Sequence, residues 1–379
     1  MRYLQIQVKG YRALADVTLD LHPLTVMIGP NGCGKTSLLE IFQLLKEAAQ
    51  ERLAEALSSL GGFTNILTRT SDAPPRLEVV LKVDMESVPS IGPLTYHLTL
   101  EPGPHGIAFV SVQEHLWQSE PDGGHRRIIY STTPTGPELQ LAKRPLRESG
   151  ILIKSEAEPE ALRDRLTQTL SLGPLEVSLR APVRLPQALV PTVQPGRNGE
   201  SLFAALYNMR ESKTSRSFYE RIEEILHLAF PDFGHLELQV VGAGQITLAW
   251  HEKSLTIPLY PNHLSEGTLR FLWLTTALLS PEPPPLILID EPEVSLHPEL
   301  LQILAALMRD ASARTQLLVA THSSDLIRWL RPDEVVVIDK QDGKSIFTWA
   351  NDPSLNLEGW LKEYTLADLW YMGNLGGRP

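Results

Sequence analysis

The hydrophobic and polar positions of this chain follow different rhythms in its first, middle and last thirds. Over residues 2–9 and 17–21 apolar and polar side chains alternate, which is typical of half-buried strands. Residues 24–29, LTVMIG, form a mainly apolar run that ends in glycine, and residues 35–57 then repeat apolar positions at helical spacing. The first 60 residues are therefore predicted to contain a buried strand, a glycine-rich turn and a helix.

The middle of the chain combines short strands with helices. Between 61 and 155, alternating segments such as RLEVVLKV and LTYHLTL are separated by Pro and Gly turns, which predicts an antiparallel sheet. Between 156 and 260 we expect a mixed insert, with helices over 156–171 and 201–229 and a hairpin of HLELQVV and QITLAW. No sustained heptads or fixed repeat occur, so this insert is expected to be compact.

The last third alternates helical and strand patterns. LRFLWLTTALL and PELLQILAALMRDA have helical spacing, whereas LILID, TQLLVATH and EVVVID are strand-like. Such alternation predicts a mainly parallel sheet covered by helices. Residues 261–350 are expected to complete a split α/β core begun by residues 1–60. Residues 351–379 are a tail in which Trp370 and Tyr371 form a docked apolar cap.

Composition and charge narrow the class of protein. Of 379 residues, 42% are hydrophobic and 21% charged, as in soluble globular proteins. The single cysteine excludes an internal disulfide and fits a cytoplasmic location. The longest apolar stretch, 269–279, is shorter than the roughly 20 residues that span a bilayer, so no membrane span is expected. A net charge of -11 argues against a broadly basic surface, which leaves only local patches such as KRPLR, 143–147, for nucleic acid.

GPNGCGKTS fits the phosphate-loop pattern G-x-x-x-x-G-K-[ST], between a predicted strand and a predicted helix. In such a loop backbone N–H groups surround the β-phosphate, Lys35 reaches the β and γ oxygens, and the Thr36 hydroxyl ligates Mg²⁺. Cys33 is interpreted as a small residue that fits the loop, and Ser37 either touches the α-phosphate or packs. The expected nucleotide-binding residues are Gly29, Pro30, Asn31, Gly32, Cys33, Gly34, Lys35, Thr36 and Ser37.

Two later segments supply acidic and imidazole groups. LILIDEPEVSLHP predicts a buried strand whose carboxyl end presents Asp290 and Glu291, at the edge where ligands collect in open α/β sheets. We assign Asp290 to the Mg²⁺ shell and Glu291 to the attacking water. In LLVATHSSDL, His322 leaves another buried strand, where it is expected to bind the γ-phosphate or hold the water.

HLSEGTLRFLWL begins an amphipathic helix with Ser265, Glu266 and Gly267 at its N-terminal end. A helix start of this kind favours an anion, yet the chain's own phosphates are already enclosed by the phosphate loop. In one interpretation, Ser265 and Gly267 bind the γ-phosphate held by a second copy, so that two ATP molecules join two chains. In the other, Ser265 caps its own helix, with Glu266 in the first turn.

In this order, GPNGCGKTS, LSEGT, LILIDEPEVSLHP and ATHS resemble the Walker A, signature, Walker B with D-loop, and switch-histidine motifs of ABC-type ATPases. The opening GYRALADVTLDLHPLTVMIGPNGCGKTSLLE resembles the RecF, SMC and OLD (overcoming lysogenization defect) branch, and the chain is similar to small stand-alone OLD-like AAA family ATPases without a TOPRIM domain. The resemblance implies an ABC-type P-loop NTPase head with a split core, a mixed sheet flanked by helices, and an inserted α+β lobe. It also implies ATP and Mg²⁺ as ligands, an approach of Arg12 to the nucleotide, and contact of Ser295 and His297 across a homodimer.

The sequence departs from this family at defined positions. Glu266 stands where transporter sequences usually have glycine, which fits the DNA-repair and defence branch. No Asp-x-Asp motif occurs, so a TOPRIM nuclease of the OLD kind is expected on a partner chain. The glutamine that senses Mg²⁺ in ABC proteins stays open between Gln43 and Gln113.

Three functions follow as alternatives. The first is an ATPase whose nucleotide-dependent dimerisation regulates a separate effector, such as a TOPRIM-like or HNH-like nuclease, in antiphage defence or DNA repair. The second is a nucleotide-gated assembly scaffold with little turnover. An ABC transporter motor is least favoured, because nothing resembles a membrane-coupling partner sequence. DNA binding rests on the resemblance alone, and the effector and trigger stay unnamed.

Overall fold

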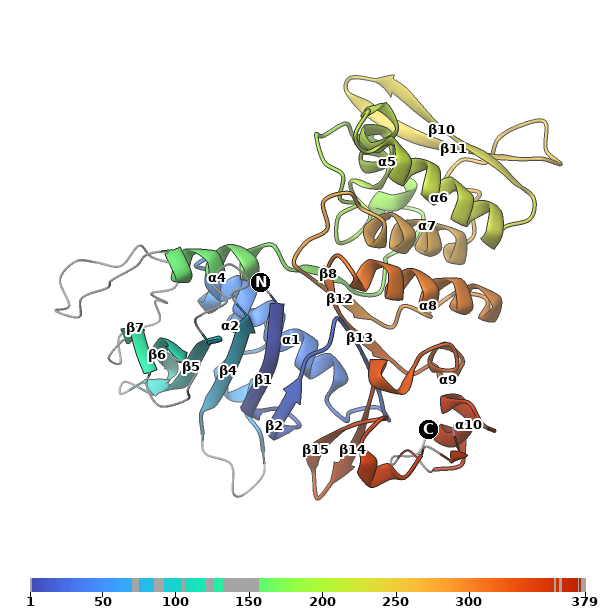
Figure 1. Cartoon of the computed structure of the whole chain (residues 1–379). Helices are drawn as coiled ribbons and strands as arrows, with labels where there is room; N and C mark the ends of the chain where they lie inside the picture. Colours follow the sequence, from blue (N-terminus) through green and yellow to red (C-terminus); the bar gives the residue numbers. More distant parts are fainter. Residues whose placement is uncertain are drawn as a thin grey trace. The chain divides into compact units, whose positions relative to one another are not determined.

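The computed structural model describes residues 2–69, 75–84, 92–103, 106–119, 126–131, 157–357, 359–360, 363–373 and 375 (Figure 1). The chain forms two compact units. Unit 1 comprises Met1–Thr169 and Pro332–Pro379, and unit 2 comprises Leu170–Arg331. The expected domain limits at 60, 155, 260 and 350 stay predictions, and the KRPLR segment lies outside the described residues.

The largest sheet of unit 1 is antiparallel, with the order β2-β1-β4-β5-β6-β7. Its strands are β1 (Arg2–Tyr11), β2 (Leu14–Asp20), β4 (Leu77–Asp84), β5 (Leu94–Gly103), β6 (Gly106–Ser119) and β7 (Arg126–Ser131). Buried and partly exposed residues alternate strictly along β4, so one face of the sheet forms the core. The N-terminal strands β1 and β2 thus extend the antiparallel sheet that the sequence predicts for the middle of the chain.

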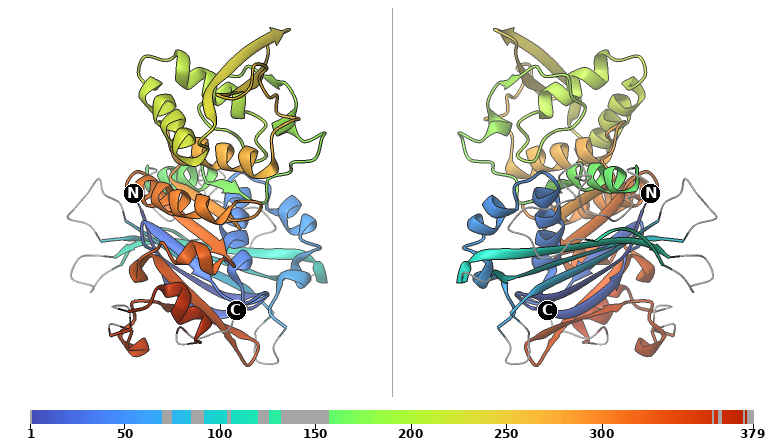
Figure 2. Two further views of the ribbon diagram at one scale, coloured as in Figure 1. Left: turned by 90° about the vertical axis from the view of Figure 1, so that its right-hand side faces the viewer. Right: turned by 90° about the vertical axis from the view of Figure 1, so that its left-hand side faces the viewer.

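Helices of unit 1 lie against this sheet (Figure 2). The ring of Tyr3 on β1 packs edge-on against Phe42 of α1, with 5.6 Å between ring centroids. The covering helices are α1 (Lys35–Ala49), α2 (Leu53–Ser59), α3 (Phe63–Ile66) and α4 (Ala157–Thr167). The long apolar stripe of α1 therefore faces the strands, as its helical spacing predicts.

In a second group of strands in unit 1, a strand from the N-terminal part of the chain pairs with a strand from the C-terminal part. β3 (Leu24–Ile28) pairs in parallel with β14 (Val335–Gln341), which pairs antiparallel with β15 (Lys344–Trp349). All residues of β3 are buried, including Thr25, which explains its mainly apolar sequence. The short 3-10 helices η2 (Pro332–Glu334) and η3 (Pro353–Leu355) flank this hairpin.

The C-terminal tail of unit 1 ends in α10 (Leu366–Tyr371), whose Thr365 and Asp368 form a capping box. Trp370 is 2% exposed and so belongs to the expected apolar cap. Tyr371 is 62% exposed, so its expected place in that cap is wrong. Neighbouring positions on a helix point in different directions, and only one of the two aromatic rings reaches the core.

Unit 2 contains the predicted alternation of helices and parallel strands. β12 pairs in parallel with β13 on one side and with β8 on the other. The strands are β8 (Leu170–Leu172), β12 (Leu286–Asp290) and β13 (Gln316–Thr321), and the helices are α7 (Glu266–Leu278), α8 (Pro298–Ser312) and α9 (Ser324–Ile327). α7 is buried from Leu269 to Leu278, because it packs against α5, α6 and α8.

The predicted hairpin and helices of the insert also lie in unit 2. β11 (Gln245–Glu252) pairs with β10 (Phe233–Gly242) and with the short β9 (Gln187–Ala188). The remaining elements are η1 (Pro182–Arg184), α5 (Leu202–Glu211) and α6 (Arg216–Ala229). In the described part of the chain, no helix combines the length and apolar character needed to cross a membrane.

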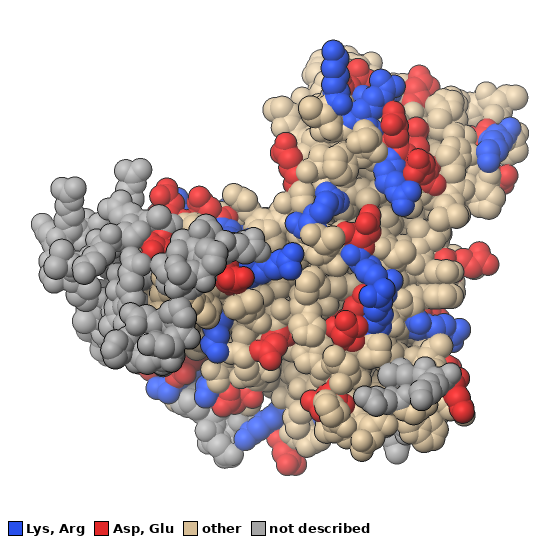
Figure 3. All heavy atoms as spheres, viewed as in Figure 1, with Lys and Arg blue, Asp and Glu red and all other residues tan. Residues whose placement is uncertain are grey.

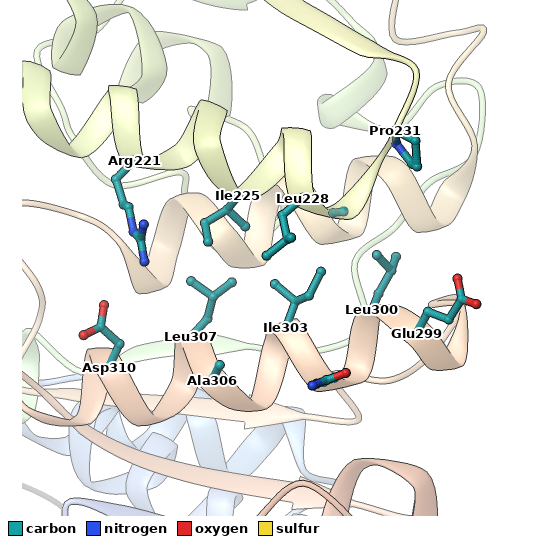
Figure 4. Close-up of a pocket in the computed structure, with 12 residues that line it drawn as sticks. Arg221, Ile225, Leu228, Pro231, Glu299, Leu300, Ile303, Ala306, Leu307 and Asp310 are labelled. Atoms are coloured by element: carbon teal, nitrogen blue, oxygen red, sulfur yellow. The ribbon is translucent and has the colours of Figure 1, made fainter.

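An apolar groove of about 620 Å³ lies between α6 and α8 of unit 2 (Figure 4). Ile225 and Leu228 of α6 point toward Ile303 and Leu307 of α8 across this groove. None of the site residues expected from the sequence lines it. The groove is therefore separate from the residues that the sequence motifs select.

Candidate functional site

The phosphate loop lies in unit 1 between β3 and α1, and Lys35 is the first residue of α1. Gly32 and Gly34 have φ angles of 73° and 108°, in the region that glycine adopts without steric cost. At Gly29 an added Cβ would collide with the carbonyl oxygen of Ile338 on β14. The glycines of the motif are thus required by backbone conformation and by close packing.

Lys35 is 4% exposed and folds back into the loop. Its Nζ donates to the carbonyl oxygens of Gly29 at 2.5 Å and Pro30 at 3.1 Å, and lies 3.7 Å from Cys33 Sγ. Carbonyl oxygens of the loop itself thereby hold the ammonium. Thr36 is exposed, as a ligand of Mg²⁺ must be, whereas Cys33 is fully buried.

Ser345 on β15 fastens the phosphate loop from the other end of the chain. It is 5% exposed, and its Oγ lies 2.6 Å from Cys33 O and 3.0 Å from Ala13 O. Its backbone N–H also donates to Ala13 O at 3.1 Å. Sequence reasoning missed Ser345, because a single serine in a polar hairpin carries no recognisable pattern.

Arg12 adopts a left-handed conformation, with a φ of 46°. Its Nη1 is 2.9 Å from Glu40 Oε2, which also accepts a 3.0 Å hydrogen bond from the Tyr11 hydroxyl. Arg12 lines a pocket of about 450 Å³ together with Arg69 and Lys340. Because none of the described lining residues is acidic, this pocket of unit 1 favours an anion. Arg69 and Lys340 were not predicted from the sequence, because neither belongs to a recognisable motif.

The acidic edge of unit 2 brings two predicted residues together. Asp290 ends β12, and the N–H of Glu291 donates to Ala320 O of β13 at 2.8 Å. Glu291 Oε1 then lies 3.6 Å from His322 Nε2, with both side chains roughly one-third exposed. A carboxylate and an imidazole at this separation, open to solvent, can hold a water molecule and exchange protons with it.

Glu293 is a third carboxylate on this edge that sequence reasoning did not select. Its Oε1 accepts a 2.9 Å hydrogen bond from the backbone N–H of His322. Its Oε2 is buried and has no hydrogen-bond partner among the described residues. Glu293 therefore fixes the backbone from which the imidazole of His322 projects.

Ser265 is the N-cap of α7. Its exposed Oγ accepts from Thr268 N at 3.0 Å, which confirms the capping interpretation for the free chain. Such a cap contributes about 1 kcal/mol. Because the hydroxyl stays at the surface, capping does not prevent contact with an external anion, and the trans γ-phosphate role stays a prediction.

The first turn of α7 touches the loop that follows Glu291. Ser295 has a φ of 63°, and its carbonyl oxygen lies where a Cβ on Gly267 would have to be. Ser295 Oγ is 3.5 Å from Glu266 Oε2. His297 is the N-cap of α8, where its Nδ1 accepts from Glu299 N at 3.4 Å.

Two buried arginines hold the backbone around α7. Arg184 is 8% exposed and donates to Val177 O at 2.6 Å, Pro261 O at 2.6 Å and Leu264 O at 3.0 Å. Arg270 is 4% exposed. Burial lowers the pKa of Arg270, and the carboxylates of Glu291, Glu293 and Glu266 oppose this effect. Arg184 thus fixes the loop that precedes Ser265. Arg270 lies close to the carboxylates of Glu266, Glu291 and Glu293.

The candidate Mg²⁺ ligands fit a site completed by phosphates. Among the described residues, no group of three or more His, Cys, Asp or Glu side chains can hold a metal ion. Mg²⁺ is usually bound by one or two protein groups together with phosphate oxygens and water. The Thr36 hydroxyl and the Asp290 carboxylate are each of a ligand type that Mg²⁺ accepts, and their joint role stays a prediction. Gln43 on α1 and Gln113 on β6 both stay candidates for the sensing glutamine.

Comparison with solved structures identifies the fold. An SMC head bound to the C-winged helix domain of ScpA has a TM-score of 0.57 at 14% identity, covering 92% of this chain and 98% of that chain. An SMC head with an extended coiled coil, bound to the C-terminal domain of ScpA derived from Pyrococcus furiosus, has a TM-score of 0.57 at 11% identity, covering 95% and 99%. At these identities the likeness concerns the fold.

A curated relative is similar to this chain over a short stretch. An OLD nuclease of Thermus scotoductus is 49% identical over 41 residues, which are 11% of this chain and 8% of the relative. The fold is that of the SMC heads, and the sequence motifs are similar to those of P-loop heads of the RecF, SMC and OLD kind. The chain belongs to the family described as AAA domain, putative AbiEii toxin, Type IV TA system, whose model matches residues 24–328.

Proposed function

We propose that the chain is an ATPase that binds Mg·ATP, dimerises on it and separates after hydrolysis. The observation that carries the proposal is the Glu291 and His322 pair, 3.6 Å apart at the carboxyl ends of β12 and β13. A phosphate loop alone supports nucleotide binding, whereas this pair adds groups that activate water. The family to which the chain belongs supports nucleotide binding as well.

Each group has a distinct role in the proposed reaction. Residues 29–37 hold the triphosphate, with Lys35 leaving its loop carbonyls for the β and γ oxygens. Thr36 and Asp290 would hold Mg²⁺, which when bound would neutralise charge that develops on the phosphates. Glu291 orients the attacking water and accepts its proton, and His322 holds the same water or the γ-phosphate. The cationic pocket of Arg12, Arg69 and Lys340 gives further positive charge on unit 1.

Dimerisation follows from the exposed tip of α7. Ser265, the Gly267 backbone and Ser295 are proposed to complete the γ-phosphate site of a second copy, so that ATP joins the two chains. The partner effector is proposed to be a separate nuclease chain, in antiphage defence or DNA repair, by analogy with the OLD relative. On the face seen in Figure 3, Lys and Arg are interspersed with Asp and Glu over the described residues, so DNA binding gains no support.

The decisive experiment combines phosphate release with light scattering. The purified chain should release phosphate from Mg·ATP, and Lys35→Ala should not. Glu291→Gln should lose roughly 10²-fold or more of turnover, because water activation is lost, yet should form a dimer with Mg·ATP. Release no higher than that of Lys35→Ala would favour the scaffold alternative, and a monomeric Glu291→Gln at saturating Mg·ATP would refute dimerisation.

A further inference from the structure

The groove between α6 and α8 of unit 2 takes no part in the proposed reaction, because none of the residues that line it belongs to a site motif. Its wall on α6 includes Ile225 and Leu228, three positions apart, and its wall on α8 includes Ile303 and Leu307, four positions apart (Figure 4). Residues at these spacings lie on one face of a helix and form a continuous ridge. The two ridges face each other and enclose a volume of about 620 Å³.

Apolar side chains of the groove are exposed at its opening and buried at its floor. Leu228 is 67% exposed and Ala306 is exposed, whereas Leu307 is 3% exposed. Covering the apolar surface of Leu228 with a ligand is therefore favourable. A groove between two helical ridges is the shape into which the apolar stripe of a third helix packs. None of the described lining residues belongs to a strand, so the groove has no strand edge to which an extended segment could add.

The charge of the groove that the chain itself does not balance is negative. Arg221 on α6 has its Nη1 2.8 Å from Glu224 Oε2, so its charge is balanced on its own helix. Across the groove, Asp310 forms no side-chain hydrogen bond or ion pair within the part of the chain that the structure describes. The side chain of Glu299 is 89% exposed and lies 3.7 Å from His297 Nδ1. Two carboxylates of α8 are thus open to a cation from a ligand.

These two carboxylates stand at opposite ends of the α8 wall. Glu299 is in the first turn of α8 and Asp310 is in the last, eleven positions further on, which corresponds to about 16 Å along the helix. A carboxylate in the last turn of a helix is disfavoured by the negative end of the helix dipole, and a bound cation relieves this effect. The groove therefore has an apolar middle between two acidic ends. It complements a helix whose apolar stripe lies between two basic residues at the same separation.

We propose that the groove between α6 and α8 is the docking site for an amphipathic helix of a partner protein, with a basic residue at each end of its apolar stripe. The stripe covers Leu228 and Ile303, and the two basic residues pair with Glu299 and Asp310. Apolar contact holds the helix, and charge selects it from other amphipathic helices. Docking requires neither ATP hydrolysis nor dimerisation, so it is independent of the proposed function.

Two synthetic peptides of about 18 residues, long enough to form a helix on binding, are the probes. Both carry leucines at spacings of three and four. Lysines flank the leucines of the first peptide, eleven positions apart, and glutamates take their places in the second. Fluorescence anisotropy with the full-length chain should show that the lysine peptide binds roughly tenfold or more tightly than the glutamate peptide. Added salt should reduce this difference.

Leu228→Gln tests the apolar contact, and its fold is expected to be kept because Leu228 is largely exposed. It should weaken binding of the lysine peptide roughly tenfold. Leu179→Gln is the matched control, because Leu179 is 74% exposed in unit 2 and does not line the groove. It should bind the peptide as the wild type does. Phosphate release should be the same in both variants and in the wild type.

Reversal of charge tests the selection. The double variant Glu299→Lys and Asp310→Lys should prefer the glutamate peptide over the lysine peptide, because both ends of the groove then carry the opposite charge. Both side chains are exposed, so the variant is expected to fold. An unchanged preference in this variant would show that the two carboxylates do not contact the peptide.

Four other results would overturn the docking site. They are binding of neither peptide, equal binding of both peptides to the wild type, a loss in Leu228→Gln no larger than in Leu179→Gln, and occupation of the groove by a second copy of the chain. Light scattering without nucleotide detects the last one as a dimer that Leu228→Gln abolishes. Loss of phosphate release in Lys35→Ala leaves peptide binding unchanged, so the docking site and the proposed ATPase fail separately.

Discussion

Replacement of Gly267 by alanine tests the contact between the tip of α7 and the loop after Glu291. The new Cβ would lie closer than 3.0 Å to Ser295 O, a separation that real Cβ atoms essentially never show. Because Ser295 O belongs to the backbone, the loop or the helix must shift by at least about half an ångström. Overpacking of this kind costs about 1–3 kcal/mol, and the higher helix propensity of alanine returns up to about 1 kcal/mol. We expect a net loss of about 1–2 kcal/mol in the free energy of unfolding.

The shift should also impair hydrolysis, since misplacement of catalytic groups by about 1 Å can cost roughly 10²-fold in rate. Binding of a fluorescent ATP analogue to the phosphate loop should stay unchanged. Gly173→Ala is the matched control, because its Cβ meets nothing within 4 Å. Urea unfolding and phosphate release would measure both effects. A Gly267→Ala protein as stable and as active as Gly173→Ala would refute the close contact.

Two further predictions concern unit 1. Ser345→Ala removes the hydroxyl that contacts Cys33 O, and a lost hydrogen bond of about 1 kcal/mol should weaken binding of a fluorescent ATP analogue roughly fivefold; undiminished affinity would contradict the fastening role. Burial lowers the pKa of His97 below its usual value of 6.5, so the unfolded chain takes up this proton at a higher pH than the folded protein does. Stability should therefore fall as the pH drops below about 6.5, and less steeply in His97→Gln; identical urea midpoint shifts between pH 7.5 and 5.5 in both proteins would count against it.

The residues that sequence reasoning located are those with a local pattern. The apolar run of β3 followed by glycines can only be a buried strand entering a tight turn, and the structure confirms both. The pair of Glu291 and His322 followed from two apolar strands, because the carboxyl ends of neighbouring parallel strands meet at one edge. The capping of α7 by Ser265 was likewise readable from residue type and spacing.

The residues that sequence reasoning missed act over long separations in the chain. Ser345 reaches Cys33 across 312 positions, and Arg184 reaches Leu264 across 80, through backbone carbonyls that carry no side-chain signal. The left-handed conformations of Glu291 and Ser295 were equally unpredictable, because neither residue type favours them. The alternation of apolar and polar residues in β1 and β2 showed that they are strands. The strands with which they pair are set by contacts that a local sequence pattern does not contain.

The pairing of β3 with β14 in unit 1 has a consequence for how the protein folds during synthesis. β3 acquires its neighbour β14, and Cys33 its contact with Ser345, only once residues 335–345 have been synthesised. A nascent or prematurely terminated chain therefore exposes a glycine-rich loop without the support that holds its shape. We expect a chain that lacks these C-terminal strands to bind nucleotide more weakly, because the phosphate loop then lacks its contact with Ser345.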